Sequence, residues 1–441
     1  MRRTIFIIIT ISVFLGLISC SNTPDKLLRI QENGLYGFVD TLANVKIEPQ
    51  YKYCGGFSKD GYALVISKAQ ILNDTLEIKY GFIDTHNKLI VDTINDLKIA
   101  VPELGSLWKM YDAESFVNKY NSSDLGFMDS YFAELRVSQG LYQYNDDNHH
   151  IGYKNLKGEI AIPAKFKFAG PFVENVAIVS EGITFDPNKS MSDNLNTFSI
   201  INNKGEYIKE KAWAYIPPFS KAGLTWCSEI NLEEDENGNL SPSLVWTQIN
   251  RAGKITIGPV NGSAGSMVYN GFPDNDGLYI YYFPDILGMH VGYSFINKDG
   301  KFATDKNGDN EITMWGEDTE VFDDVTSFSE GFAGVKVFIN EESRWTFMTP
   351  NFEIATTELY DSVKPFTNNL AVVQQMNPSI KHLGDWGVID KNFNTVIPFK
   401  FSEISSFSDG FAYAKIRSTK YDREGWINRQ GVFIWETNRK K

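Results

Sequence analysis

The chain has 441 residues, of which 42 are basic and 55 acidic, giving a net charge of −13. This acidic balance argues against nucleic acid as a partner, because nucleic-acid binding needs clustered lysine and arginine. It also argues against broad adhesion to anionic lipid. Three cysteines are too few for a small domain held together by disulfides.

The N-terminus has the residue order of a secretory signal. Basic residues at positions 1–3 precede an apolar run of 15 residues, 4–18, which is shorter than the roughly 20 residues of a membrane-spanning helix. Leu17-Ile18-Ser19-Cys20 then resembles a bacterial lipobox, in which the cysteine is lipidated. We expect a signal peptide at 1–19, a lipid on Cys20 and a tether at 20–26. The alternative is a plain signal peptide with an incidental cysteine.

One five-residue phrase returns along the whole chain: an aromatic residue, a small residue, two apolar residues, then Asp or Asn. Its alternation and its aromatic content predict a β-strand. Glycine follows most copies and suits a tight hairpin, and the Asp or Asn side chain is expected to bond to the turn backbone. These carboxylates are therefore predicted to be structural. The copies of this opening phrase lie at 36–40, 80–84, 151–155, 198–202, 246–250, 293–297, 345–349, 386–390 and, shortened, 425–428.

Two further elements complete each unit. An apolar-Pro step, as in Ile162-Pro163 and Ile397-Pro398, predicts a strand end or an edge strand, because proline lacks the N–H for a ladder bond. A closing phrase, Phe-Ser-(Asp/Glu)-Gly at 328–331 and 407–410, precedes a strand that contains alanine. One such unit cannot bury its own apolar face, so neighbouring units are expected to stack.

The units begin about 40 to 52 residues apart, apart from one interval of 71 residues between Gly81 and Gly152. The excess predicts an insertion near 99–123, with a short helix at 113–120. No Pro/Ser-rich linker divides the array. We therefore expect a single β-repeat domain over residues 27–437.

These phrases resemble the WG-repeat family of bacterial proteins. Residues 33–66 and 381–416 match the family pattern almost throughout, whereas Ser or Thr replaces the glycine at 199, 247, 294 and 346. The resemblance implies an interaction or structural role, often on exported proteins. It brings no shared active site.

The expected fold class is all-β, a tandem β-repeat array. A propeller-like ring and an open β-superhelix (a solenoid) both fit the repeats. Residues 27–30 look like a closing-phrase strand and 425–435 like an opening-phrase hairpin, so the two ends of the chain are able to complete one unit together, as in a propeller. Nine units are many for a propeller, which usually has about four to eight blades, and an open array tolerates uneven spacing.

The strongest local signal for a ligand is the run 305–312. Asp305, Asn307 and Asp309 offer oxygen atoms at alternate positions, as in a calcium loop. The twelfth position is Gly316, however, and Glu317 comes one residue late. The alternatives are a structural calcium site and an expanded polar hairpin tip. No other cofactor is predicted.

Other chemistry-bearing residues favour plain structural interpretations. His149 and His150 beside Asp146 fit a surface loop better than a metal site. Cys54 and Cys227 are expected to be buried free thiols. Tryptophans outside the opening phrase are expected in the core, although exposed ones would stack on sugars or proteins; they are Trp108, Trp213, Trp226, Trp315 and Trp435.

The leading hypothesis for function is a non-catalytic, lipid-anchored module that binds an envelope protein or glycan. Membrane contact is expected through the lipid alone, at the outer membrane, on its periplasmic face or at the cell surface. The alternative is an envelope glycoside hydrolase or lyase, whose acidic residues would converge from loops outside the repeat; candidates are Glu103, Glu114 and Glu317. A purely structural envelope protein is the third possibility.

Overall fold

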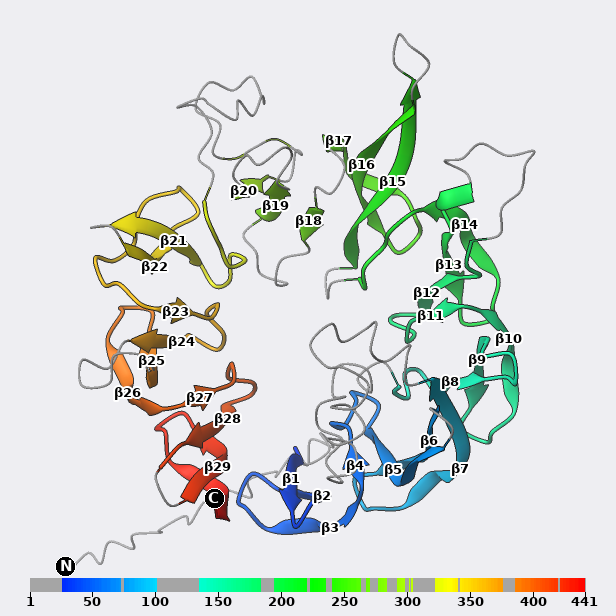
Figure 1. The fold of residues 1–441 in the computed structure, drawn as a ribbon, viewed down its shortest axis with the longest axis horizontal. Helices are drawn as coiled ribbons and strands as arrows, with labels where there is room; N and C mark the ends of the chain where they lie inside the picture. Colours follow the sequence, from blue (N-terminus) through cyan, green and yellow to red (C-terminus); the bar gives the residue numbers. More distant parts are fainter. Residues whose placement is uncertain are drawn as a thin grey trace, which may run out of the picture.

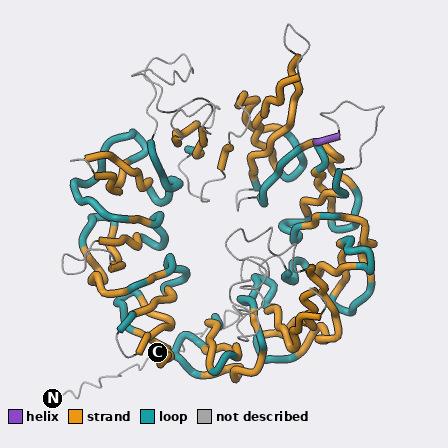
Figure 2. The backbone as a smooth tube through the Cα atoms, viewed as in Figure 1, coloured by secondary structure: helices purple, strands orange, loops and turns teal. Residues whose placement is uncertain are grey.

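The computed structural model describes residues 26–72, 75–100, 135–183, 194–219, 223–234, 240–262, 267–269, 277–283, 292–297, 301, 303, 322–339, 342–375, 385–418 and 421–440. These residues form strands and connecting turns, with one short helical segment (Figure 2). The strands belong to nine small antiparallel sheets, which we number 1 to 9 along the chain. The all-β repeat fold predicted from the sequence is confirmed.

The first four sheets cover residues 28–213. Sheet 1 contains β1 (Leu28–Glu32), β2 (Leu35–Val39) and β3 (Val45–Tyr51). Sheet 2 contains β4 (Tyr53–Cys54), β5 (Tyr62–Leu72), β6 (Thr75–Asp84) and β7 (Leu89–Ala100). Sheet 3 contains β8 (Leu141–Asn145), β9 (Ile151–Asn155) and β10 (Ile160–Phe166). Sheet 4 contains β11 (Phe168–Ala169), β12 (Val176–Ser180), β13 (Phe198–Asn202) and β14 (Tyr207–Trp213).

The remaining five sheets complete the array. Sheet 5 contains β15 (Leu224–Glu234), β16 (Leu240–Asn250) and β17 (Ile255–Gly262), and sheet 6 contains β18 (Met267–Tyr269), β19 (Tyr279–Phe283) and β20 (Gly292–Ile296). Sheet 7 contains β21 (Ala333–Ile339) and β22 (Glu342–Met348). Sheet 8 contains β23 (Ser362–Val363), β24 (Leu370–Gln375), β25 (Asp385–Asp390) and β26 (Thr395–Phe401). Sheet 9 contains β27 (Glu403–Ile404), β28 (Phe411–Ile416), β29 (Tyr421–Asn428) and β30 (Phe433–Lys440).

Every sheet is assembled from parts of two sequence units. The strand after a closing phrase, which we call the alanine strand although it contains alanine only in sheets 2, 4, 7, 8 and 9, pairs with the opening-phrase strand that follows it. Ala63 of β5, for example, pairs with Ile83 of β6. Where the unit has an apolar-Pro strand, as in sheets 1, 3 and 8, that strand pairs on the other side of the opening-phrase strand. The proline strands β3, β10 and β26 are edge strands, as the sequence predicts. Their prolines lie inside the strands and not at their ends, because each strand bulges there and needs no ladder donor.

The bulge leaves no room for a side chain at the second position of the opening phrase, so this position is glycine. A Cβ atom on Gly37 would lie 2.3 Å from the carbonyl oxygen of Ile47, and one on Gly425 would lie 2.1 Å from that of Trp435. Both distances are too short for any side chain, and the obstructing atoms are backbone. Glycine therefore allows the edge strand to cross directly over the middle strand.

Two of the four units that carry Ser or Thr at this position use the hydroxyl instead. Ser199 accepts a hydrogen bond from the backbone N–H of Lys211 at 2.8 Å. Thr346 donates one to the carbonyl oxygen of Thr356 at 3.0 Å. In both units the hydroxyl bonds to the outer segment beside it. In units with glycine, the backbone of that segment lies directly against the glycine. The departure from the family pattern is therefore a structural replacement that keeps the array intact.

The core lies between the sheets. Buried apolar clusters join each sheet to the next all along the array. An aromatic pair recurs in these interfaces: the Phe38 ring lies 4.7 Å from Phe57, and the Tyr153 ring lies 4.8 Å from Phe172. Each pair stacks an opening-phrase aromatic on the closing-phrase phenylalanine 19 residues later, so one phrase alone buries neither ring.

The sheets follow one another around a ring, with the proline strands outermost (Figure 1). The first and last sheets meet: Leu28 and Ile30 of sheet 1 are buried against partly buried Trp426 and Trp435 of sheet 9. This contact favours the ring over the open array. The two ends do not complete one sheet together, however, because β1–β3 and β27–β30 are separate sheets that pack against each other. The insertion near 99–123 lies outside the described residues, except for positions 99 and 100, which end β7.

Candidate functional site

The repeated Asp and Asn residues cap the hairpins, as predicted. Each carboxylate or amide oxygen accepts hydrogen bonds from the backbone N–H groups two and four residues later, as Asp40 does from Leu42 and Asn44 at 2.9 Å. A further hydrogen bond from the Asn44 side chain helps to lower the pKa of Asp40 to about 2. Backbone hydrogen bonding from Asn394 likewise lowers the pKa of Asp390. These carboxylates are charged and committed to their turns.

His150 and Asp146 form another such turn. Asp146 accepts the backbone N–H of His150 at 2.8 Å, and the imidazole Nδ1 lies 3.5 Å from the carboxylate. Within the described part of the chain, no group of three or more His, Cys, Asp or Glu side chains is placed to hold a metal. The surface-loop interpretation of His149 and His150 agrees with this geometry.

The cysteines and two of the tryptophans occupy core positions. Cys54 and Cys227 are buried free thiols, as predicted. Burial raises the pKa of the Cys227 thiol to about 12 and that of Cys54 still further. Trp213 and Trp226 are fully buried, so the core interpretation is confirmed for these two.

Several predicted site residues lie outside the described residues: Cys20, Asp305, Asn307, Asp309, Glu103, Glu114, Glu317, Trp108 and Trp315. Lipidation of Cys20 and calcium binding at 305–309 therefore stay predictions. The described residues include no helix with the length and apolarity to cross a membrane.

A charged cluster ties sheet 3 to sheet 4 at their outer strands. The hydroxyl of Tyr207 on β14 donates to Glu181 at 2.5 Å, and Lys165 on β10 lies 3.2 Å from the same carboxylate. Lys211 approaches Glu181 from a second side at 3.6 Å. The hydrogen bond from Tyr207 lowers the pKa of Glu181. Since both lysines contact the one carboxylate, this cluster joins the outer strands of the two sheets.

A pocket of about 330 Å³ lies between sheet 4 and residues 215–219, the segment that leads from sheet 4 to sheet 5. Its floor is aliphatic: Val176 and Ile178 come from β12, and Ile216 comes from the segment before β15. Pro217 and Pro218 continue this wall, and prolines add apolar surface without offering a backbone N–H. The full lining is Arg136, Phe168, Gly170, Pro171, Val173, Val176, Ile178, Phe198, Tyr215, Ile216, Pro217, Pro218 and Phe219.

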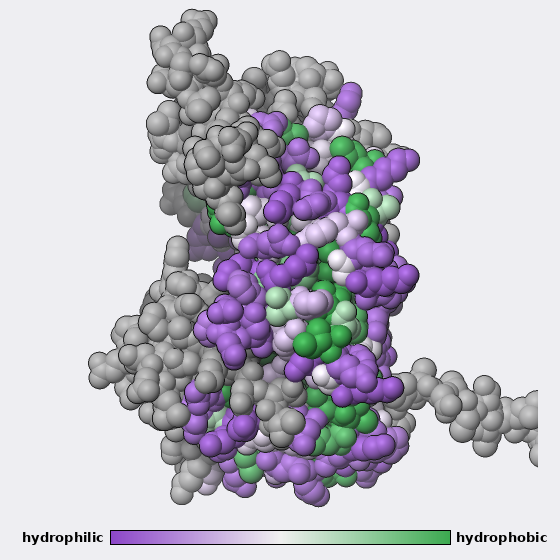
Figure 3. All heavy atoms as spheres, turned by 90° about the vertical axis from the view of Figure 1, so that its right-hand side faces the viewer, coloured by the Kyte–Doolittle hydropathy of each residue, from purple (hydrophilic) through white to green (hydrophobic). Residues whose placement is uncertain are grey.

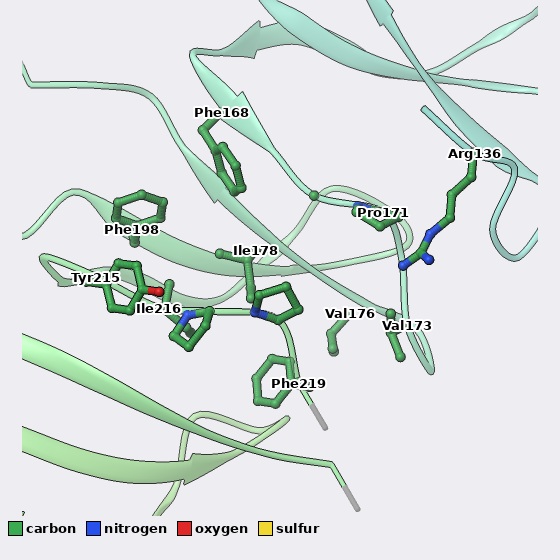
Figure 4. Close-up of a pocket in the computed structure, with 13 residues that line it drawn as sticks. Arg136, Phe168, Pro171, Val173, Val176, Ile178, Phe198, Tyr215, Ile216 and Phe219 are labelled. Atoms are coloured by element: carbon green, nitrogen blue, oxygen red, sulfur yellow. The ribbon is translucent and has the colours of Figure 1, made fainter. Parts of the chain in front are cut away.

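Aromatic rings flank the pocket on one side, and the guanidinium group of Arg136 lies on the other (Figure 4). Phe168 and Tyr215 are 43% and 42% exposed, although both belong to the lining. The Phe168 ring lies 5.6 Å from Phe198 in an edge-on contact, which holds it in place at the rim. Arg136 is exposed. The pocket is thus built to hold an apolar group, with a positive charge beside it for an anionic one.

This pocket was not predicted from the sequence. The signal available was local: Ala214-Tyr215-Ile216-Pro217-Pro218-Phe219 carries two prolines where other closing phrases carry one or none. Phe168, in turn, belongs to no repeated phrase. The pocket arises because one closing segment departs from the repeat and leaves space beside the regular sheet 4.

The family comparison matches the chain in five places. The matching family is described as WG containing repeat, and the matched residues are 36–66, 151–182, 321–337, 345–377 and 386–418. These segments each run from an opening phrase to the strand after a closing phrase, except the shorter third one. No curated protein matches the chain.

Solved structures give only remote similarities. The Pyrococcus horikoshii acylaminoacyl peptidase aligns at 9% identity and TM-score 0.34, over 68% of this chain and 51% of the peptidase. Prolyl oligopeptidase B from Galerina marginata aligns at 8% identity and TM-score 0.34, over 86% of this chain and 47% of its own. A Bacteroides caccae protein of unknown function aligns at 14% identity and TM-score 0.22, over 60% of this chain and 94% of that protein.

The chain spans about half the length of the two peptidases. At these TM-scores the alignments carry no inference about activity. The five family matches are different in kind, because they coincide with the phrases that build the sheets. The chain belongs to the WG repeat-containing family.

Proposed function

We propose that this chain is an exported, lipid-anchored and non-catalytic envelope protein whose repeat ring binds a protein partner through the pocket beside sheet 4. The observation that carries the binding role is the pocket itself, with an aliphatic floor, exposed aromatic rings at its rim and Arg136 beside it. The N-terminal lipobox pattern that ends at Cys20 supports the export and the anchor.

The lining favours a protein segment over a glycan. Sugars present hydroxyl groups at nearly every position, and burying these against Val176, Ile178 and the prolines would leave them without hydrogen bonds. An apolar side chain suits this floor, and a neighbouring carboxylate suits Arg136. The exposed rings of Phe168 and Tyr215 add the aromatic contact area that is common in protein interfaces.

A non-catalytic role is supported by what the repeated carboxylates do. Asp40 and Asp390 accept backbone hydrogen bonds within their own turns and have lowered pKa values. A general acid needs a raised pKa and a free approach to substrate. The repeat therefore supplies turn caps, and the binding surface comes from positions that depart from it.

A pull-down from the native envelope tests the binding role, with and without Ca²⁺. The bait is the chain from residue 21 onward, compared with a variant that combines Phe168→Ser and Tyr215→Ser. The control combines Phe338→Ser and Tyr421→Ser, which are exposed residues away from the pocket. We expect the wild type and the control to retain a protein that the pocket variant loses. Retention by all three would reject the pocket as the binding site.

A further inference from the structure

Exposed aliphatic side chains recur at one place in the repeat. Of the fourteen exposed large hydrophobic residues among those described, nine lie in the turn after the opening-phrase strand or at the start of the outer segment that follows it. Their exposed fractions run from 38% to 81%. We call them the aliphatic rim: Leu42, Val45, Leu89, Ile160, Ile208, Ile255, Ile354, Val396 and Val432.

The rim lies on one face of the ring. In each sheet the start of the alanine strand pairs with the end of the opening-phrase strand, as Tyr62 does with Asp84 and Phe411 with Asn428. The hairpin turn and the closing-phrase turn therefore lie at the same end of every such sheet. We call this end the turn face. Figure 3, a side view, shows separate hydrophobic patches following one another along the molecule.

Neighbouring hairpins keep this orientation around the ring. The turn glycine Gly205 of sheet 4 lies against Ile162 of sheet 3, and Gly431 of sheet 9 lies against Ile397 of sheet 8. Each turn thus packs beside the outer strand of the preceding sheet, close to that sheet's own rim residue. The aliphatic rim therefore follows the turn face from one sheet to the next around the ring.

Lys26, the first residue that the structure describes, lies on this face. Lys26 donates hydrogen bonds to the Ser408 carbonyl oxygen and to the Asp409 carboxylate, both in the closing turn of sheet 9, at 2.9 Å. Lys26 comes only six positions after Cys20, and a chain of that length spans at most about 20 Å. A lipid on Cys20 would therefore hold the turn face against the bilayer that carries it.

We propose that the turn face is a membrane-contacting surface whose aliphatic rim inserts into the interface of a zwitterionic bilayer. This inference rests on the proposed lipid anchor. The anchor makes contact with the bilayer intramolecular, so that weak single contributions add along the rim. The turns mix charges, with Lys157 beside Glu159 and Lys204 beside Glu206, which suits a zwitterionic surface better than an anionic one.

The test uses the full lipidated protein in phosphatidylcholine vesicles, with an environment-sensitive fluorophore on a single introduced cysteine. Ile160→Cys places it on the rim. Phe338→Cys is the control, because Phe338 is 71% exposed and lies beside the hairpin between Ile339 and Glu342, at the opposite end of sheet 7. Cys54 and Cys227 are buried and do not compete for the label.

We expect the label at 160 to shift its emission to the blue and to be quenched by spin-labelled lipid, while the label at 338 stays open to aqueous iodide. Combining Val45→Ser, Ile255→Ser and Ile354→Ser should reduce lipid quenching at 160 at least twofold. The exposed pair Ile183→Ser and Tyr421→Ser should leave it unchanged.

Equal iodide access at 160 and 338 on vesicle-bound protein would overturn the membrane face and leave the anchor standing. Shielding of 160 without vesicles would assign the face to a second copy or another protein, and would also overturn it. If mass analysis finds no lipid on Cys20 and the chain does not float with vesicles, the anchor itself fails and this inference falls with it.

Discussion

The indole nitrogen of Trp426 donates a hydrogen bond to the backbone carbonyl oxygen of Arg29 at 2.7 Å, across 397 positions of sequence. This bond joins β29 of the last sheet to β1 of the first. It lies within an apolar contact that also includes Leu28 and Trp435. The closure of the ring thus depends on buried surface, on this bond and on the hydrogen bonds from Lys26 to the closing turn of sheet 9.

Trp426→Phe should weaken this closure while keeping an aromatic ring in the contact. Loss of the hydrogen bond is expected to lower the free energy of unfolding by about 1 kcal/mol. The control is Trp386→Phe, which changes a partly buried tryptophan that packs within sheets 8 and 9. Urea denaturation of both variants measures the difference. An equal loss in the two variants would show that the closing bond contributes nothing of its own.

The opening-phrase glycine gives a second prediction. Gly37→Ala places a Cβ against the Ile47 backbone at 2.3 Å, so the edge strand must move, at a cost of roughly 2–3 kcal/mol. Gly56→Ala is the matched control, since nothing lies within 4 Å of its Cβ position and the change should stay within about 0.5 kcal/mol. Thermal unfolding compares them. Similar Tm values for both variants would contradict the proposed crossing of the two strands.

The turns allow two opposite effects of glycine to be separated. Ala43 has a φ of 66°, which costs an L-residue about 1 kcal/mol, so Ala43→Gly should stabilise the protein by that amount. Phe393 has a φ of 64°, but its ring packs on Phe332 and Phe347. Phe393→Gly should therefore destabilise the protein by roughly 1–2 kcal/mol despite the relieved backbone. Chemical denaturation gives both signs, and two stabilised variants would remove the packing role of Phe393.

The capping carboxylates predict a loss of stability in acid. The folded-state pKa of Asp40 is lowered from 3.8 to about 2, so its stabilising contribution is complete above about pH 4 and is lost as the pH falls toward 2. Asp390 shifts in the same direction. Combined Asp40→Asn and Asp390→Asn should flatten the pH dependence of unfolding in this window, because Asn155 and Asn428 cap their turns without charge. A dependence as steep as that of the wild type would assign the acid sensitivity to other groups.

Much of this fold is predictable because its parts are local. The alternation within the opening phrase predicts a strand, and the Asp or Asn at its end predicts a turn. Asp40 and Asn155 could therefore be assigned as turn caps from the sequence alone. The position of Pro49 inside a bulge was not predictable, because it depends on how closely the facing backbone approaches Gly37.

The ring and the pocket are harder to predict because they arise from contacts distant in sequence. No residue near Arg29 or Trp426 in the sequence indicates that these two residues form a hydrogen bond. The pocket needs Phe168, Tyr215 and Arg136 in one place, although they come from three separate segments and none occupies a repeated position. Only the double proline at 217–218 marks the departure in the sequence.

Site-specific crosslinking tests the central claim most directly, namely that the pocket beside sheet 4 holds a protein partner. A benzoyl-phenylalanine at Tyr215 in the full chain is irradiated in native envelopes, with Tyr421, exposed and remote from the pocket, as the control position. The account predicts a discrete protein adduct at 215 that is absent at 421 and weakened several-fold by Arg136→Ala. No adduct at 215, or the same adducts at both positions, would contradict it.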